Sequence, residues 1–211
     1  MQADSATRIA EGDLLRWALA EGPASEVVAR ALDLRAAHRV AFEVASPVLP
    51  AGTRGTAAPD ALLWLVRDPS RATAIEAKRV RVPASAFEGA PIGGLVQLRK
   101  GAQQVHAHVR RGFHRAVLVV LIAVDGRARS GGHWLGGGLT SDLSRTIAER
   151  LDALALEPAA GLLALVVEQP VDRDVRHAGG VGVLLSRPAV ARRQDPDLTR
   201  RVALLDASHP L

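Results

Sequence analysis

The spacing of hydrophobic residues along the chain predicts four main helices. Apolar residues recur every three or four positions, as in helices that bury one face, in four segments: 13–20, 25–37, 94–111 and 141–156. A Gly-Pro pair at 22–23 separates the first two segments. Ser25 directly follows this break and is the expected N-cap of the second helix.

Shorter apolar runs between these helices predict β-strands. Residues 39–45 alternate apolar and polar side chains, and residues 114–124 form an unbroken β-branched run that is typical of a strand buried on both faces. Further strands are predicted at 60–66, 72–82, 161–167 and 182–186. Residues 68–70, Asp-Pro-Ser, have the chemistry of a turn between the second and third strands.

The element order predicts an α/β protein. From residue 25 to residue 124 it reads α-β-β-β-α-β, followed by another helix and two strands, and this arrangement implies a central mixed sheet flanked by helices on both faces. We expect residues 1–186 to form a single domain. Residues 187–211, rich in Pro, Arg and Asp, are expected to form a C-terminal edge or arm.

Composition narrows the classes of function. The chain has no cysteine, which excludes disulfides and thiolate-bound metal centres. It carries 27 Lys and Arg, of which only Lys78 and Lys100 are lysine, and its formal charge is +5. Arginine-rich surfaces bind phosphate backbones, whereas three Phe, three Trp and no Tyr leave few platforms for base stacking. A nucleic-acid partner would therefore be held mainly through its phosphates.

The ends and the apolar runs of the sequence give no sign of a membrane partner. The N-terminus lacks the basic start and apolar core of a secretory signal, and the longest apolar run, residues 116–124, is too short to cross a bilayer. We therefore expect a cytoplasmic protein.

Three ionisable residues are predicted to converge where two core strands meet. Asp60 begins one strand, and Glu76 and Lys78 lie two apart on the next, so that the latter two share a face. A turn near Pro69 would bring Asp60 back to about the level of Lys78. Two neighbouring carboxylates repel unless a cation lies between them, and oxygen ligands suit Mg²⁺ or Mn²⁺. The alternative is a solvated ion pair at the strand ends.

Pro59-Asp60, then fifteen residues, then Glu76-Ala77-Lys78 resembles the signature of the PD-(D/E)XK nuclease superfamily. The predicted α-β-β-β-α-β order is also similar to the restriction-endonuclease-like core of that superfamily. The resemblance covers about half of the chain. It implies a metal-dependent DNA endonuclease or exonuclease that hydrolyses phosphodiester bonds, and cleavage of duplex DNA by so small a unit implies a homodimer.

The resemblance also implies roles for individual residues. Asp60, Glu76 and the backbone carbonyl of Ala77 would bind the metal ion, and Lys78 would orient or deprotonate the attacking water. Members often carry another glutamate on the first core helix, for which Glu26 is the best match.

Two further positions match parts of the superfamily pattern. Glu43 on the first strand is a reserve for the helix glutamate. Gln97 matches a glutamine that some branches carry on the helix after the lysine strand, although the tyrosine that accompanies it in certain exonucleases is absent here. The alternative for Glu26 and for Gln97 is an exposed surface position.

Two other functions remain open at this point. The chain could be a nucleic-acid-binding or assembly subunit that keeps the fold with a silent site. It could also be a nuclease that acts on RNA or on a small phosphodiester.

Overall fold

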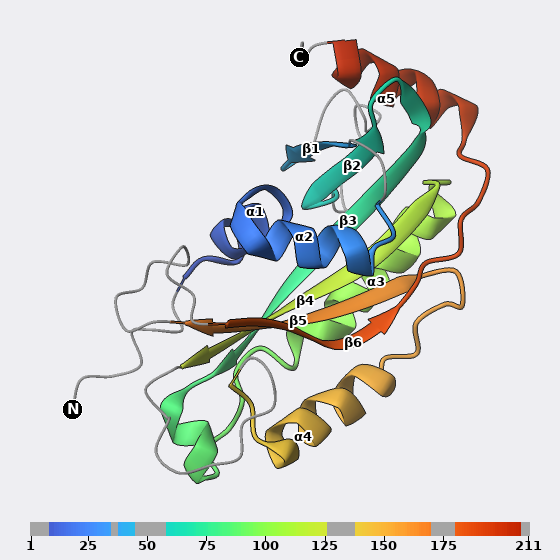
Figure 1. The fold of residues 1–211 in the computed structure, drawn as a ribbon. Coiled ribbons are helices and arrows are strands. Elements are labelled where there is room, and N and C mark those ends of the chain that lie inside the picture. Colours follow the sequence, from blue (N-terminus) through green and yellow to red (C-terminus); the bar gives the residue numbers. More distant parts are fainter. Residues whose placement is uncertain (1–8, 35–37, 45–57, 126–137, 170–179, 208–211) are drawn as a thin grey trace.

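A computed structural model of the protein describes residues 9–34, 38–44, 58–125, 138–169 and 180–207 (Figure 1). Within these residues the chain forms five α-helices, six strands and one short 3-10 helix. The helices are α1 (Glu11–Ala20), α2 (Gly22–Ala31), α3 (Gln97–Arg110), α4 (Ser141–Asp152) and α5 (Pro196–Ala207), with the 3-10 helix η2 at Ala84–Glu88. The strands are β1 (His38–Phe42), β2 (Ala61–Leu65), β3 (Asp68–Val82), β4 (Arg115–Asp125), β5 (Gly161–Gln169) and β6 (Gly180–Arg187).

The strands form one mixed sheet in the order β1-β2-β3-β4-β5-β6. β1, β2 and β3 are antiparallel neighbours, β3, β4 and β5 run parallel, and β6 is antiparallel to β5. β4 is buried from residue 116 to residue 125, as its β-branched sequence predicts. The α/β class and the central mixed sheet between helices are confirmed.

Helices cover both faces of this sheet (Figure 1). α1 and α2 pack on the face to which Ala77 of β3 points, and α3 and α4 pack on the opposite face, to which Val80 points. α5 covers the outer strands, where Leu198 and Val202 pack in one cluster with Trp64. The longest described helix, α3, has 14 residues, and no helix in the described ranges is long and apolar enough to span a bilayer.

The turn between β2 and β3 is not where the sequence indicated. It occupies residues 66–67, and residues 68–70 already belong to β3. A β-bulge between Leu63 and Leu65 gives β3 extra residues opposite β2. Pro69 is tolerated in the strand because it lies in this irregular stretch, where a missing N–H costs no regular ladder bond.

The bulge also changes the predicted register. Ala61 pairs with Ile75, so that Asp60 lies opposite Glu76, two residues earlier than the turn near Pro69 would have given. The consequence for the site is favourable, because the two acidic residues become direct cross-strand neighbours.

The start of α2 and the presence of α5 differ from the sequence-based expectations. α2 begins at Gly22, so Ser25 lies inside the helix and is not its N-cap. Proline at the first turn fits there because its missing N–H would have had no helical partner. The helix α5 was not predicted at all, although Asp195 caps it through Oδ1, which accepts from the N–H groups of residues 197 and 198.

Candidate functional site

The candidate site lies beside the first residue of β2, where β3 extends beyond β2 and forms an edge of the sheet. β2 begins at Ala61, opposite Ile75, and from there onward β3 has a ladder partner only on the β4 side. At the far end of this edge, Arg81 and Gly93 exchange backbone hydrogen bonds. The stretch 76–80 between these points therefore needs acceptors from outside the sheet.

Carboxylates provide those acceptors. The N–H of Ala77 donates to Asp60 Oδ2 over 2.7 Å, and the N–H of Arg79 donates to Glu11 Oε2 over 2.6 Å. Asp60 comes from the residue before β2, and Glu11 is the first residue of α1. Two acidic side chains are thus fixed along the strand edge by the backbone amides they satisfy.

Glu76 is fully buried on the face covered by α3, and both of its carboxylate oxygens have partners. Oε1 accepts from the Lys78 ammonium over 2.5 Å, and Oε2 lies 3.4 Å from Nε2 of His108. His108 is also fully buried and meets Phe113 edge to face, with ring centroids 5.8 Å apart. A buried carboxylate is strongly disfavoured without such partners, so the pairing fixes the position of Glu76.

The Lys78 ammonium lies among three oxygen atoms. It donates to Glu76 Oε1 over 2.5 Å and to the Ala77 carbonyl over 2.6 Å, and it is 4.0 Å from Asp60 Oδ2. The two carboxylates and the carbonyl therefore converge around one cation. This convergence is the electrostatic arrangement that two neighbouring acids require.

Gly101 of α3 makes room for the stem of Lys78. A Cβ at this position would lie 2.7 Å from Lys78 Cγ and 2.9 Å from Leu118 Cδ1, closer than carbon atoms approach without displacement. Glycine in the middle of a helix normally costs about 1 kcal/mol relative to alanine. Here it allows α3 to pack directly on the lysine.

Burial changes the acidity of Asp60. Removal from solvent raises the pKa of its carboxyl from 3.8 to about 6, and the nearby Glu76 carboxylate adds to the rise. The Ala77 N–H and the Lys78 ammonium act in the opposite direction, since both favour the ionised form. Asp60 thus binds a proton more readily than an exposed aspartate does.

A cavity of about 200 Å³ opens beside this edge on the α1 side of the sheet. Acidic residues dominate the polar part of its described lining, in which Arg16 is the only basic residue. The residues that line it are Glu11, Gly12, Leu15, Arg16, Phe42, Glu43, Asp60 and Ala77. A cation is the ligand that such a lining favours.

The structure brings Asp60, Glu76, Ala77 and Lys78 together but does not bring the other predicted residues to them. Glu26 is exposed on α2 and does not line the cavity. Gln97 is exposed at the start of α3, one turn before Gly101, the residue that touches Lys78.

One helix residue takes a place that the sequence assigned to another residue. Glu11, rather than Glu26, is the helix glutamate beside Asp60, and a sequence reading that began the first helix at residue 11 would have found it. Glu43, the reserve candidate, lines the same cavity, with its carboxylate 3.4 Å from Arg16. His108 had no signal in the sequence, because only the packing of α3 shows that it faces Glu76.

The donor set fits a hard divalent cation. Asp60 Oδ2, Glu76 Oε1 and the Ala77 carbonyl are oxygen donors, and they already surround a positive charge. Among the described residues, no three His, Cys, Asp or Glu side chains form a metal-binding group. One of the three donors here is a backbone carbonyl, so the set depends on the conformation of β3 as well as on side chains.

No family model matches the chain, and no curated protein or solved structure is significantly similar to it.

Proposed function

We propose that the protein is a metal-dependent nuclease of the PD-(D/E)XK type that hydrolyses DNA phosphodiester bonds with Mg²⁺ or Mn²⁺. One observation carries the proposal. The carboxylates of Asp60, just before β2, and of Glu76 on β3 converge with the Ala77 carbonyl on the ammonium of Lys78 at the edge of β3. The element order from α2 to β4, which is α-β-β-β-α-β, supports the restriction-endonuclease-like assignment.

Each residue has a defined part in this chemistry. Asp60, Glu76 and the Ala77 carbonyl would hold the ion. When bound, the ion supplies hydroxide near neutral pH and offsets the charge that develops on the phosphoryl oxygens. Lys78 supplies a flexible ammonium that orients the attacking water and stabilises the phosphate charge. The Ala77 N–H fixes Asp60, and His108 contacts the far oxygen of Glu76.

The burial of the site argues for use of its charge rather than for a silent fold. Glu76 is fully buried and Lys78 is 8% exposed, so this ion pair was removed from water at considerable cost. A hydrophobic pair of similar size would stabilise the sheet equally well or better. Retention of the charged pair is explained if both groups act on a substrate.

The test is cleavage of linear, circular and branched DNA by the purified protein, with Mg²⁺, Mn²⁺ or EDTA. We expect cleavage that needs the metal and that the Asp60→Asn variant lacks. Mn²⁺ should also raise the melting temperature of the wild type more than that of Asp60→Asn. The ion binds only the folded protein, and the variant lacks one of the carboxylates that would hold it. Equal cleavage by wild type and by Glu76→Ala across these substrates would refute the proposal.

A further inference from the structure

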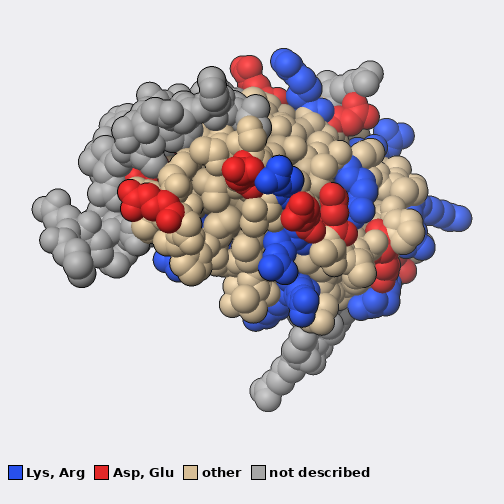
Figure 2. Space-filling view, turned by 90° about the horizontal axis from the view of Figure 1, so that it is seen from below, with Lys and Arg blue, Asp and Glu red and all other residues tan. Residues whose placement is uncertain are grey.

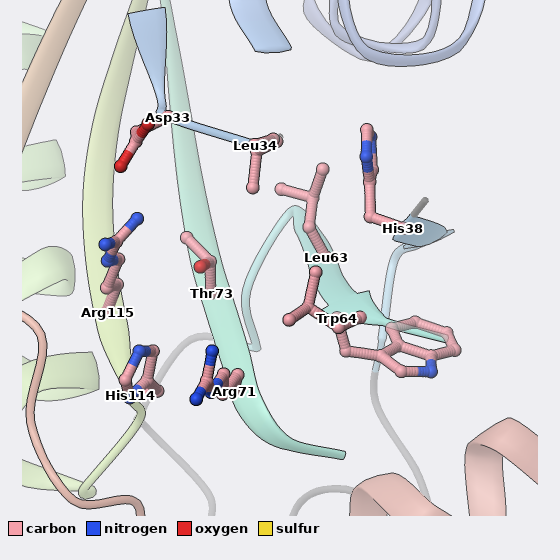
Figure 3. Close-up of a pocket in the computed structure, with 10 residues that line it drawn as sticks. Asp33, Leu34, His38, Leu63, Trp64, Arg71, Thr73, His114 and Arg115 are labelled. Atoms are coloured by element: carbon pink, nitrogen blue, oxygen red, sulfur yellow. The ribbon is translucent and has the colours of Figure 1, made fainter. Parts of the chain in front are cut away.

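We propose that the surface at the start of β3 and β4, away from Asp60 and Glu76, binds phosphates and holds duplex DNA beyond the site of cleavage. This surface consists of Arg71, His114, Arg115 and the segment Arg192-Arg193 (Figure 3 shows the first three). The inference rests on the proposed function for the identity of the substrate. It rests on its own residues for the place of binding.

The surface is built from two adjoining cavities. Among the described residues that line a cavity of about 220 Å³ are Arg71, Arg115, His38 and His114, with Asp33 as the one acidic residue. The described lining of a second cavity, of about 640 Å³, includes four arginines and a histidine but no acidic residue: Arg71, His114, Arg192, Arg193 and Arg200. Arg71 and His114 line both cavities, so the two form one continuous basic concavity.

The chain segment that carries Arg192 and Arg193 is held firmly in place. The N–H of Arg192 donates to the His114 carbonyl over 2.9 Å, and the carbonyl of Arg192 lies 2.6 Å from His114 Nδ1. Three residues later, the N–H of Asp195 donates to the Gly112 carbonyl over 2.9 Å. These contacts fix the backbone and leave both arginine side chains exposed.

Gln194 holds the same segment against the start of β3. Its side chain is buried, and Oε1 accepts from the N–H of Ala72 over 2.9 Å while Nε2 donates to the Pro69 carbonyl over 2.8 Å. A buried amide that satisfies backbone groups of β3 ties the segment to the bulged start of that strand. The backbone at Arg192 and Arg193 is therefore preorganised, which lowers the entropic cost of ordering this segment when a ligand binds.

The basic concavity differs in its charge from the face of the molecule that Figure 2 shows. On the face seen in Figure 2, Lys and Arg side chains are interspersed with Asp and Glu side chains. Nearby carboxylates do pair with two arginines of the concavity, since Asp68 contacts Arg71 and Asp197 contacts Arg200. Arg192 and Arg193 have no ion pair or hydrogen bond to their side chains among the described residues, so their charge is available to a ligand.

The chemistry favours the backbone of a duplex over a single strand. The concavity presents guanidinium and imidazole groups, and the aromatic residue at its edge, Trp64, is 1% exposed with its indole N–H bonded to Asp206. Single strands are usually held by bases stacked on exposed aromatic rings. Arginines without such rings bind phosphates.

The distance along β3 between the carboxylates and the basic concavity suits a duplex substrate that contacts both. Arg71 and Glu76 are five residues apart on the strand, or roughly 16 Å at the rise of an extended chain. That length corresponds to about five base pairs along a duplex axis. A duplex with its cleaved phosphate at the carboxylates would have to extend over about this length to contact the basic concavity.

The test measures binding separately from cleavage. A fluorescein-labelled linear duplex is titrated with wild-type protein in EDTA, with the double variant Arg192→Ala/Arg193→Ala, and with the control Arg99→Ala/Arg150→Ala. The control removes two exposed arginines that line a cavity between α3 and α4, so the net charge changes equally.

We expect the Arg192/Arg193 variant to bind about tenfold more weakly, with a salt dependence of log Kd lower in slope by roughly two. We expect the control to bind within about twofold of wild type. Equal losses in the two double variants would overturn the inference, because binding would then follow net charge alone. Displacement of the duplex by inorganic phosphate, at concentrations where sodium chloride of equal ionic strength has no effect, would also overturn it in favour of a small-anion site.

The two proposals fail separately in this design. Wild type that binds the duplex through Arg192 and Arg193 but cleaves no DNA with any metal leaves the surface standing and refutes the nuclease. Wild type that cleaves, with binding unaffected by the Arg192/Arg193 substitutions, refutes the surface and leaves the nuclease standing.

Discussion

The middle of β3 and the surface beyond its start use charge in opposite ways. Near its middle, Glu76 and Lys78 are buried, paired with each other, and fixed by a neighbouring strand and by α3. Beyond its start, Arg192 and Arg193 are exposed, and only their backbone is fixed. The difference corresponds to two tasks: a reacting group must be held in one geometry, whereas a phosphate contact needs mainly charge at the right place.

The energetic consequences differ in the same way. Removing one member of a buried ion pair leaves an uncompensated charge and costs about 3–5 kcal/mol of stability. Removing an exposed arginine without a partner changes stability by less than about 0.5 kcal/mol. Substitutions at Glu76 and Lys78 must therefore be controlled for folding, whereas those at Arg192 and Arg193 report directly on binding.

The largest expected effect is loss of cleavage when the buried pair is neutralised. The variant Glu76→Gln/Lys78→Met removes both charges together, so no lone charge stays buried. We expect cleavage to fall by about 10³-fold or more, because both the metal ligand and the ammonium are lost. Duplex binding in EDTA should stay close to that of wild type, and a gel assay for cleavage beside anisotropy for binding separates the two.

The opposite pattern would contradict the assignment of cleavage to the middle of β3 and of duplex binding to the surface beyond its start. If this double variant loses duplex binding and keeps cleavage at saturating protein, the carboxylate end is a binding surface and not a reaction centre.

A smaller effect is expected from a methyl group at Gly101. Gly101→Ala places a carbon against Lys78 Cγ, so the ammonium must move, and we expect kcat to fall about tenfold with little change in KM. The melting temperature should fall as well, because the added carbon overpacks the core. Gly12→Ala is the stability control: its added carbon has nothing within 4 Å, and we expect it to raise the melting temperature slightly. A rise in melting temperature for Gly101→Ala would show that the packing against Lys78 is loose.

The sequence predicted the sheet better than it predicted the surroundings of the site. The runs that became β2, β3 and β4 are strongly apolar, and the spacing of Asp60, Glu76 and Lys78 was enough to suggest their convergence. The turn was misplaced because residues 68–70 have turn chemistry, yet the bulge accommodates them within β3. Local sequence does not encode a bulge whose extra residues are held by a distant side chain such as Gln194.

Helix contributions to the site were the least predictable. Glu26 and Glu11 both lie near the start of a helix, and only the packing of α1 and α2 on the sheet decides which one reaches Asp60. His108 differs from His106 only in the direction in which it leaves α3. His108 meets Glu76, while His106 accepts a hydrogen bond from the N–H of Glu157 over 3.0 Å. Tertiary packing sets these contacts, and one sequence does not contain that information in a local pattern.

His108 provides the next comparison, between two histidines on one helix. In His108→Leu, Glu76 Oε2 loses its buried partner, and we expect the Mg²⁺ concentration for half-maximal cleavage to rise about 10-fold or more. His106→Leu, which removes a histidine that contacts Glu157 rather than Glu76, should leave that concentration unchanged within about twofold. His108→Gln retains a side-chain N–H donor and should recover part of the loss, which a role in packing alone does not predict.

The smallest expected effect is a pH dependence of stability that comes from Asp60. The pKa of its carboxyl is about 6 in the folded protein and 3.8 as an ordinary aspartate, so between these values the folded state binds more protons than the unfolded state. The free energy of unfolding of the metal-free protein therefore loses a contribution from Asp60 as pH rises from about 4 to about 6, and this loss levels off above about 7.

Asp60→Asn, which can still accept from the Ala77 N–H, lacks this contribution. We therefore expect the melting temperature of Asp60→Asn in EDTA, relative to that of wild type, to rise as the pH increases from about 4 to about 6. Because the Asp60 side chain is 39% exposed, solvent screening keeps the effect modest. A constant difference between the two proteins from pH 4 to pH 7 would show that the carboxyl is ordinary in acidity, and the contrast between a desolvated acidic end and a hydrated basic end would then lose its electrostatic basis.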